Sequence, residues 1–137
     1  MDPSAHRGRV AFYVSDPACV APEVVAMGPF DLVVIDDVLT HTVQPLHVLK
    51  GLAALTAPGS VLVVASDNDW DPASTPRNSW LGGFKMNGED LSTVTMLRHN
   101  LKRHFSFLDS ADVAKVTQRH VRSYHLAILE TTAWVRL

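Results

Sequence analysis

The chain is short of the residues that mark several classes of protein. Its 137 residues include one cysteine, Cys19, so an internal disulfide is excluded and a reducing compartment is favoured. No apolar run approaches the roughly 20 residues of a membrane-spanning helix, and the opening residues MDPSAHRGR lack the apolar centre of a secretory signal. We therefore expect a cytoplasmic protein that has no membrane partner.

An excess of charge of one sign is also missing. Twelve Lys and Arg residues against fourteen Asp and Glu residues give a formal net charge of -2. A strongly basic surface is therefore not expected, and nucleic acid is a poor candidate partner.

The motifs of common metal sites and of one large hydrolase class are absent. The seven histidines include no H-x-x-x-H pair, the cysteine is not part of a C-x-x-C motif, and G-x-S-x-G does not occur. Asp67, Asp69 and Asp71 alternate along one loop, but the Gly and Glu of a calcium loop do not follow them. We interpret these aspartates as turn-forming and expect no metal site.

Hydrophobic residues are plentiful and are arranged in regular patterns. They make up 47% of the chain, which is enough for one globular domain over residues 1–137. Two apolar runs without alternation, Leu32–Ile35 and Ser60–Ser66, are typical of strands buried on both faces. The segment between them has leucines at helical spacing, at Leu46, Leu49, Leu52 and Leu55. The order strand, helix, strand predicts a pair of parallel strands and an α/β fold.

Shorter patterns predict the remaining elements. Arg9–Val14 is β-branched and aromatic and ends in turn residues, so we expect a first strand there. Asn87 is a candidate N-cap of a second helix that has Glu89 and Asp90 in its first turn. The chain finishes in β-rich segments, the last of which we expect to pair as an antiparallel hairpin.

Three loops rich in polar and aromatic residues follow the predicted strands: SDPAC, DDVLTHT and SDNDWDPASTPRNSWLGG. Ligands of open parallel sheets bind outside the carboxyl ends of the strands, so these loops are expected to gather at one ligand-binding edge. The two tryptophans of the third loop leave an alternative open, which is an ordinary connection with buried aromatic side chains.

The third loop also carries a resemblance. The pattern W-x-x-x-x-T-P-R-x-x-W-L-G-G, from Trp70 to Gly83, resembles the 4-mercaptohistidine N-methyltransferase family, which corresponds to the C-terminal domain of ovothiol synthase. The run FDLVVIDD and the tail RHVRSYHLAILETTAWVR are similar to the same family, so the resemblance covers roughly Arg9 to Arg136. It implies the Rossmann-like fold of class I S-adenosylmethionine-dependent methyltransferases, which has a mostly parallel sheet and a C-terminal antiparallel hairpin.

The resemblance further implies an activity and a set of site residues. The activity is methyl transfer from S-adenosylmethionine to an imidazole nitrogen of a thiohistidine, as in ovothiol biosynthesis. Asp16 matches the acidic position that contacts the adenine of the cofactor, Ala18 matches one of its neighbours, and Asp36 falls where the fourth strand of the family opens onto the cofactor. The substrate-side loop of the family is matched by Trp70, Pro76, Arg77 and Trp80.

The residue types in these loops suit that chemistry. Aromatic faces and carboxylates hold a sulfonium cation well, and the guanidinium of Arg77 is suited to an amino acid carboxylate. A surface or structural ion pair is the alternative for Arg77. His41 and His125 are candidate proton acceptors, with a structural or solvated role as the alternative for each.

Part of the family pattern is missing from this sequence. The family opens with a strand that ends in a Gly-rich cofactor turn, whereas the first predicted strand here, Arg9–Val14, matches the third strand of the family. Family strands run in the order 3-2-1-4-5-7-6, so the fourth is expected to form a bare edge that invites pairing with another chain. We therefore expect this partial domain, which lacks the first two strands, to bind S-adenosylmethionine weakly or not at all by itself.

Two functional interpretations remain open. One is a methyltransferase domain fragment that acts on a small amino acid-like substrate. The other is a catalytically inactive interaction module, or a gene fragment, that pairs with a second copy or with a complementing chain at the exposed edge.

Overall fold

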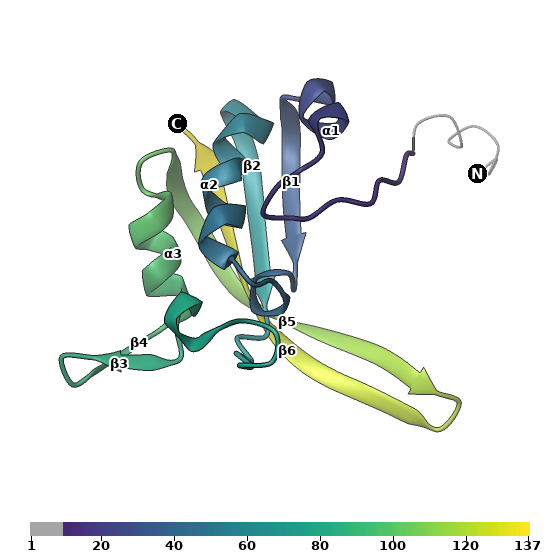
Figure 1. The fold of residues 1–137 in the computed structure, drawn as a ribbon, viewed down its shortest axis with the longest axis vertical. Helices are drawn as coiled ribbons and strands as arrows, with labels where there is room; N and C mark the ends of the chain where they lie inside the picture. The colour runs from purple at the N-terminus through teal and green to yellow at the C-terminus, as the bar shows by residue number, and fades with distance from the viewer. Residues whose placement is uncertain (1–9) are drawn as a thin grey trace.

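A computed structural model describes residues 10–137, which form a mixed α/β fold (Figure 1). The helices are α1 (Pro22–Met27), α2 (Pro45–Leu55) and α3 (Thr93–Leu101), together with short 3-10 helices at Leu39–His41 and Arg77–Ser79. The strands are β1 (Phe30–Asp36), β2 (Thr56–Ser66), β3 (Phe84–Met86), β4 (Glu89–Leu91), β5 (Phe105–His120) and β6 (Ser123–Arg136). No helix among these residues is long and apolar enough to cross a membrane.

The main sheet has four strands in the order β1-β2-β6-β5. β1 and β2 are parallel, as the strand-helix-strand pattern predicts, and β6 is antiparallel to both β2 and β5. The sheet of the described residues is therefore mixed: β1, β2 and β5 run in one direction, and β6 runs in the opposite direction between β2 and β5.

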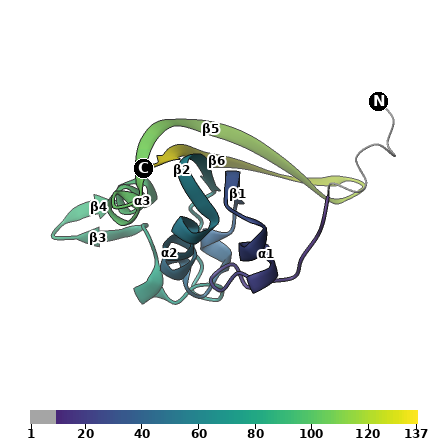
Figure 2. The ribbon, with the colours of Figure 1, turned by 90° about the horizontal axis from the view of Figure 1, so that it is seen from above.

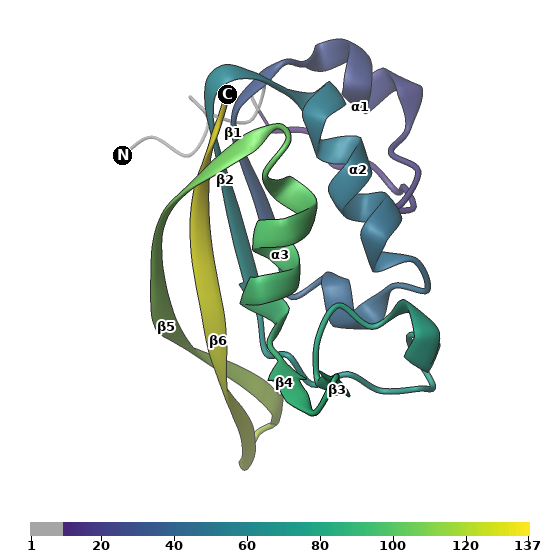
Figure 3. The same ribbon diagram turned by 90° about the vertical axis from the view of Figure 1, so that its left-hand side faces the viewer.

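All three helices lie on the same side of the main sheet (Figure 2), and Figure 3 shows α2 and α3 packed side by side there. Side chains of β2 and β6 that face the helices, Leu62, Val64 and Trp134, are each at most 1% exposed. They form one apolar cluster with side chains from α2 and α3. The helical leucine spacing that predicted α2 therefore marks the face that is buried.

The strand predicted over Arg9–Val14 is not formed in the part that the structure describes. Residues 10–14 have no strand pairing, Phe12 and Val14 are 94% and 105% exposed, and Arg9 lies outside the described residues. A β-rich sequence forms a strand only when it pairs with a neighbour, and residues 10–14 do not pair with the open edge of β1. Beyond this segment, Asp16 and Cys19 form an isolated bridge.

The helix predicted to begin at Asn87 begins five residues later. Asn87 and Gly88 have φ values of 52° and 83° and form the turn between β3 and β4, so Glu89 and Asp90 belong to a strand. An Asn-Gly pair is the preferred sequence for such a two-residue hairpin turn. The N-cap of α3 is Ser92, whose hydroxyl accepts a hydrogen bond from the backbone N–H of Thr95 at 3.2 Å.

The predicted C-terminal antiparallel hairpin is confirmed. Its two strands continue past the end of β2, the strand that it joins. β6 pairs with β2 from Val135 to Glu130, whereas its pairing with β5 continues to Ser123. Residues 113–129, which we call the arm, therefore project beyond the sheet (Figure 1). Several large apolar side chains of the arm are more than half exposed, namely Val116, Val121, Tyr124, Leu126 and Ile128.

Candidate functional site

The carboxyl ends of β1 and β2 lie next to each other, and the loops that follow them are tied together. The backbone N–H of Asp37 donates to the carbonyl oxygen of Ala65 at 2.8 Å, and that of Asp67 donates to Oδ1 of Asp37 at 3.2 Å. Further along, the hydroxyl of Thr75 donates to the carbonyl oxygen of Thr42 at 2.6 Å. The expectation that these two loops meet at one edge is confirmed.

The two tryptophans of the loop after β2 make hydrogen bonds and packing contacts within the protein. Trp70 is 8% exposed, and its indole N–H donates to the hydroxyl of Thr93 at 3.3 Å. The indole N–H of Trp80 donates to the carbonyl oxygen of Thr75 at 2.8 Å, and the two rings stack with centroids 6.3 Å apart. This part of the W-x-x-x-x-T-P-R-x-x-W-L-G-G pattern therefore has a packing role, which was the alternative left open for it.

Glycine is required at the end of that pattern for the same reason. Gly82 has a φ of 154°, and a Cβ added there would lie 2.6 Å from the backbone nitrogen of Thr93. Gly83 has a φ of 73°, and its Cβ would lie 3.2 Å from the ring of Trp70. The glycine pair thus lets the loop pass closely over the start of α3 and over Trp70.

Pro76 and Arg77, by contrast, are exposed. The guanidinium of Arg77 lies 5.8 Å from the ring centroid of Trp80, and no carboxylate of the described residues is within ion-pair distance of it. Arg77 therefore retains its full capacity to bind an anionic group from solution.

Two of the three predicted cofactor residues come together in one hollow. Asp16 and Ala18 line a hollow of about 360 Å³ together with His41, Thr42 and neighbours from the loop after β1. Oδ1 of Asp16 accepts a hydrogen bond from the backbone N–H of Ala18 at 2.8 Å, which fixes the turn. The segment before α1 and the loop after β1 thus form the two walls of a polar hollow.

Asp36 does not line that hollow. Its carboxylate is 60% exposed and forms an ion pair at 3.2 Å with the ammonium of Lys115 on the arm. The other proton-acceptor candidate, His125, also lies on the arm, where it is exposed and faces Thr117 across the hairpin.

A cluster that the sequence analysis did not identify lies beside the polar hollow. Ligand atoms of Asp37, His41 and Asp67 all lie within 4.8 Å of one another, and Nε2 of His41 is 3.9 Å from Oδ2 of Asp37. The available signal was an aspartate directly after each of two strands that were predicted to be parallel, because such positions meet at one edge.

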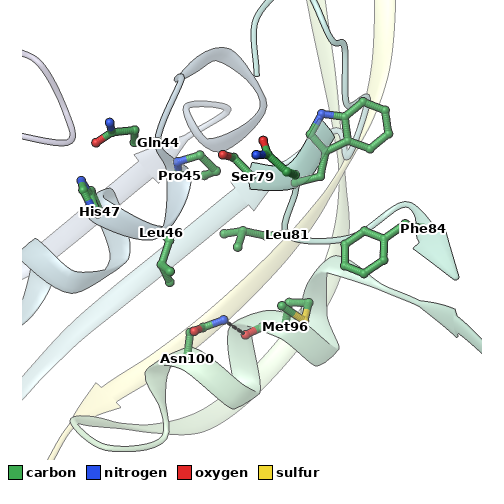
Figure 4. A pocket seen from close by; sticks show the side chains of 11 residues that line it. Gln44, Pro45, Leu46, His47, Ser79, Leu81, Phe84, Met96 and Asn100 are labelled. Carbon is green, nitrogen blue, oxygen red and sulfur yellow. Dashed lines mark hydrogen bonds between the residues drawn. The ribbon is translucent and has the colours of Figure 1, made fainter. Parts of the chain in front are cut away.

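The most voluminous of the described hollows, about 450 Å³, lies on the outer side of the same loops, between α2 and α3 (Figure 4). Trp80 is the one predicted site residue that lines it, and its other apolar walls are Leu46, Leu81, Phe84 and Met96. Gln44 lines both this hollow and the polar one, so it separates the two. Of the predicted residues, Trp80 therefore lines one hollow and Asp16 and Ala18 line the other, whereas the rest line neither: Asp36, Trp70, Pro76 and Arg77.

Comparison with known proteins adds no assignment, since no family model matches the chain and no curated protein matches it.

Proposed function

We propose that the chain is the substrate-side part of a class I S-adenosylmethionine-dependent methyltransferase domain that acts on an imidazole nitrogen of a thiohistidine. The observation that carries this proposal is the strand order β1-β2-β6-β5, with β6 antiparallel to its neighbours. This order is what remains of the order 3-2-1-4-5-7-6 when the first three strands are removed. The W-x-x-x-x-T-P-R-x-x-W-L-G-G pattern supports the specific family.

The polar hollow supports a cofactor role for Asp16 and Ala18. Asp16 and Ala18 would hold the adenosyl part of S-adenosylmethionine, which would supply the methyl group, and His41 lines the same hollow. In the reaction, the S–CH₃ bond breaks as the N–CH₃ bond forms, and the electron pair of the broken bond stays on sulfur. The protein aligns the two partners and excludes water.

The imidazole that accepts the methyl group does not need a strong base. A neutral imidazole nitrogen attacks through its own lone pair, and the proton on the other ring nitrogen leaves after transfer. Nε2 of His41, 3.9 Å from the carboxylate of Asp37, is the candidate to receive it. Exposed Arg77 is the candidate to hold the carboxylate of the amino acid substrate.

The absence of a Gly-rich cofactor turn from the sequence limits what the chain does alone. We expect weak or no cofactor binding by the monomer, and binding once a complementing chain completes the sheet beside β1. A cytoplasmic location remains a prediction from the single cysteine.

Calorimetric titration of S-adenosylmethionine into the purified chain, with the molecular mass measured in the same buffer, tests the proposal. Saturable binding by an associated form, which Asp16→Ala weakens and the matched loop variant Asp69→Ala does not, would support it, and thiohistidine methylation would then be assayed. Tight binding by the monomer would contradict the expectation that the sheet must first be completed. Absence of binding by both the monomer and every associated form would contradict cofactor use by this chain.

A specific observation favours a second candidate, an interaction module. β1 is one of the two edge strands of the main sheet in the described residues, and Leu32 and Val34 on it are each 57% exposed. An apolar hollow of about 150 Å³, lined by Val34, Val38 and Leu52 among others, lies beside that edge. An edge strand with exposed apolar side chains is a template for another strand.

A further inference from the structure

The cluster of Asp37, His41 and Asp67 is assembled from three separate segments at the carboxyl edge of the sheet. Asp37 follows β1, His41 ends the 3-10 helix after it, and Asp67 follows β2. One ligand atom from each lies within 4.8 Å of the other two. Metal-bound nitrogen and oxygen atoms lie about 2.0–2.2 Å from a zinc ion, so small side-chain adjustments would bring all three onto one ion.

The two carboxylates are held by donors on one oxygen and are open on the other. Oδ1 of Asp37 accepts from the backbone N–H of Asp67, while its Oδ2 faces His41. Oδ1 of Asp67 accepts from the backbone N–H of Asp69 at 2.9 Å and from the hydroxyl of Thr40 at 3.4 Å. Ligating carboxylates in metal sites are oriented in this way by outer hydrogen bonds.

No lysine or arginine of the described residues forms an ion pair with the cluster. The side chain of Asp37 is 17% exposed. Two carboxylates at this separation repel each other, and a divalent cation between them would turn that repulsion into attraction.

The residue that follows Asp67 in the chain has an unsatisfied buried oxygen. Oδ1 of Asn68, the residue after Asp67, is buried and receives no hydrogen bond. Its amide is fixed, because Nδ2 donates to the carboxylate of Glu130 at 2.6 Å. Unpaired buried acceptors are uncommon, and a water beside β6 would complete this one, which is not a ligand atom of the cluster.

We propose that Asp37, His41 and Asp67 bind one divalent transition-metal ion, of the zinc or manganese kind. One imidazole and two carboxylates suit such ions better than Ca²⁺ or Mg²⁺, which prefer oxygen ligands. Three protein ligands leave at least one coordination position open toward solvent, next to the polar hollow that His41 lines. The site replaces our expectation of none. An ion bound to the free nitrogen of His41 would prevent His41 from receiving the proton of the methyl acceptor, and that proton would then pass to solvent.

Titration with the metal alone tests this proposal. The full chain, without an affinity tag and in a Cys19→Ser background that removes the free thiol, is stripped with chelator and titrated calorimetrically with ZnCl₂ and with MnCl₂. The expected result is one saturable equivalent of metal and a higher melting temperature. His41→Ala and Asp67→Asn should each weaken binding by about tenfold or more.

Matched variants separate this site from incidental binding. His47→Ala and Asp69→Asn change an exposed histidine and an exposed aspartate outside the cluster, and each should leave the affinity unchanged. Melting of every variant without metal establishes that it is folded. No saturable binding of either ion, or binding that His41→Ala and Asp67→Asn leave intact, would overturn the proposal.

Discussion

The fully buried hydroxyl of Thr75 donates to the carbonyl oxygen of Thr42 at 2.6 Å and thereby joins the loop after β2 to the loop after β1. The same hydroxyl lies 3.3 Å from the carbonyl oxygen of Thr40, and the carbonyl of Thr75 itself accepts from Trp80. Thr75 therefore forms hydrogen bonds with the backbone of both loops at the candidate site. The conformation of either loop depends on the other.

Replacing Thr75 by valine should destabilise the protein by about 1–3 kcal/mol, because the substitution keeps the volume but leaves buried carbonyl oxygens without their donor. Urea unfolding followed by circular dichroism measures the change. Thr117→Val is the matched control, since Thr117 is exposed on the arm, and it should alter stability by less than about 0.5 kcal/mol. Equal effects of the two variants would contradict a linking role for Thr75.

Mutation of the W-x-x-x-x-T-P-R-x-x-W-L-G-G pattern should lower the stability of the protein at its buried residues and leave it unchanged at its exposed residues. Trp70→Phe removes the donor to the hydroxyl of Thr93, which is itself 4% exposed, and leaves unfilled volume, so we expect a loss of about 2–4 kcal/mol. Arg77→Ala should change stability by less than about 0.5 kcal/mol, because its guanidinium is exposed and has no ion pair.

Ligand binding gives a separate measurement on the same two variants. Since Arg77→Ala is expected to leave the fold unchanged, any weakening of substrate binding in that variant would report direct contact. A large loss of stability in Arg77→Ala would instead show that this arginine has a structural role.

The elements that follow from local sequence were predictable, and those that depend on distant partners were not. Residue patterns along the chain were enough to predict the apolar strand β1, the leucine stripe of α2 and the C-terminal hairpin. The strand predicted over Arg9–Val14 failed because its β-branched and aromatic composition does not determine pairing: residues 10–14 do not pair with the open edge of β1. The start of α3 failed because the turn chemistry of Asn87-Gly88 outweighed the helix-dipole pattern of Glu89 and Asp90.

The candidate site was also predictable only in part. Its location at the carboxyl edge follows from the parallel strands, whereas the grouping of Asp37 with Asp67 joins residues 30 positions apart. Only the register of β1 against β2 decides that these two residues meet. The burial of Trp70 is equally invisible in the sequence, because an aromatic residue in a loop is compatible with a ligand face and with a core position.

Replacing Gly82 and Gly51 by alanine should change the stability of the protein in opposite directions. Gly82→Ala would place a Cβ 2.6 Å from the backbone nitrogen and the hydroxyl oxygen of Thr93, at a φ of 154°, so it should destabilise the protein by more than about 2 kcal/mol. Gly51 lies within α2 with nothing within 4 Å of an added Cβ. Gly51→Ala should therefore stabilise the protein by about 1 kcal/mol through helix propensity.

Thermal unfolding of both glycine variants in one buffer provides the comparison. If Gly82→Ala were tolerated as well as Gly51→Ala, the close approach of the loop to the start of α3 would be incorrect, and so would the packing explanation for the glycine pair.

The free edge of β1 should make the mass of the protein depend on its concentration. Val33 packs against the core, whereas Leu32 and Val34 are each 57% exposed on a strand that has a partner on one side alone among the described residues. Backbone groups on the other side are open to pairing with a strand of a second molecule. Sedimentation equilibrium over a wide range of concentration would detect such association.

A charge on that edge distinguishes β1 from the other exposed apolar surface, the arm. Leu32→Lys should reduce association, because a charged side chain on an edge strand disfavours its pairing with another strand. Val116→Lys changes a side chain of the arm that is 64% exposed and should leave association unchanged. The reverse result would assign self-association to the arm, and a mass that never changes would remove the observation in favour of an interaction module.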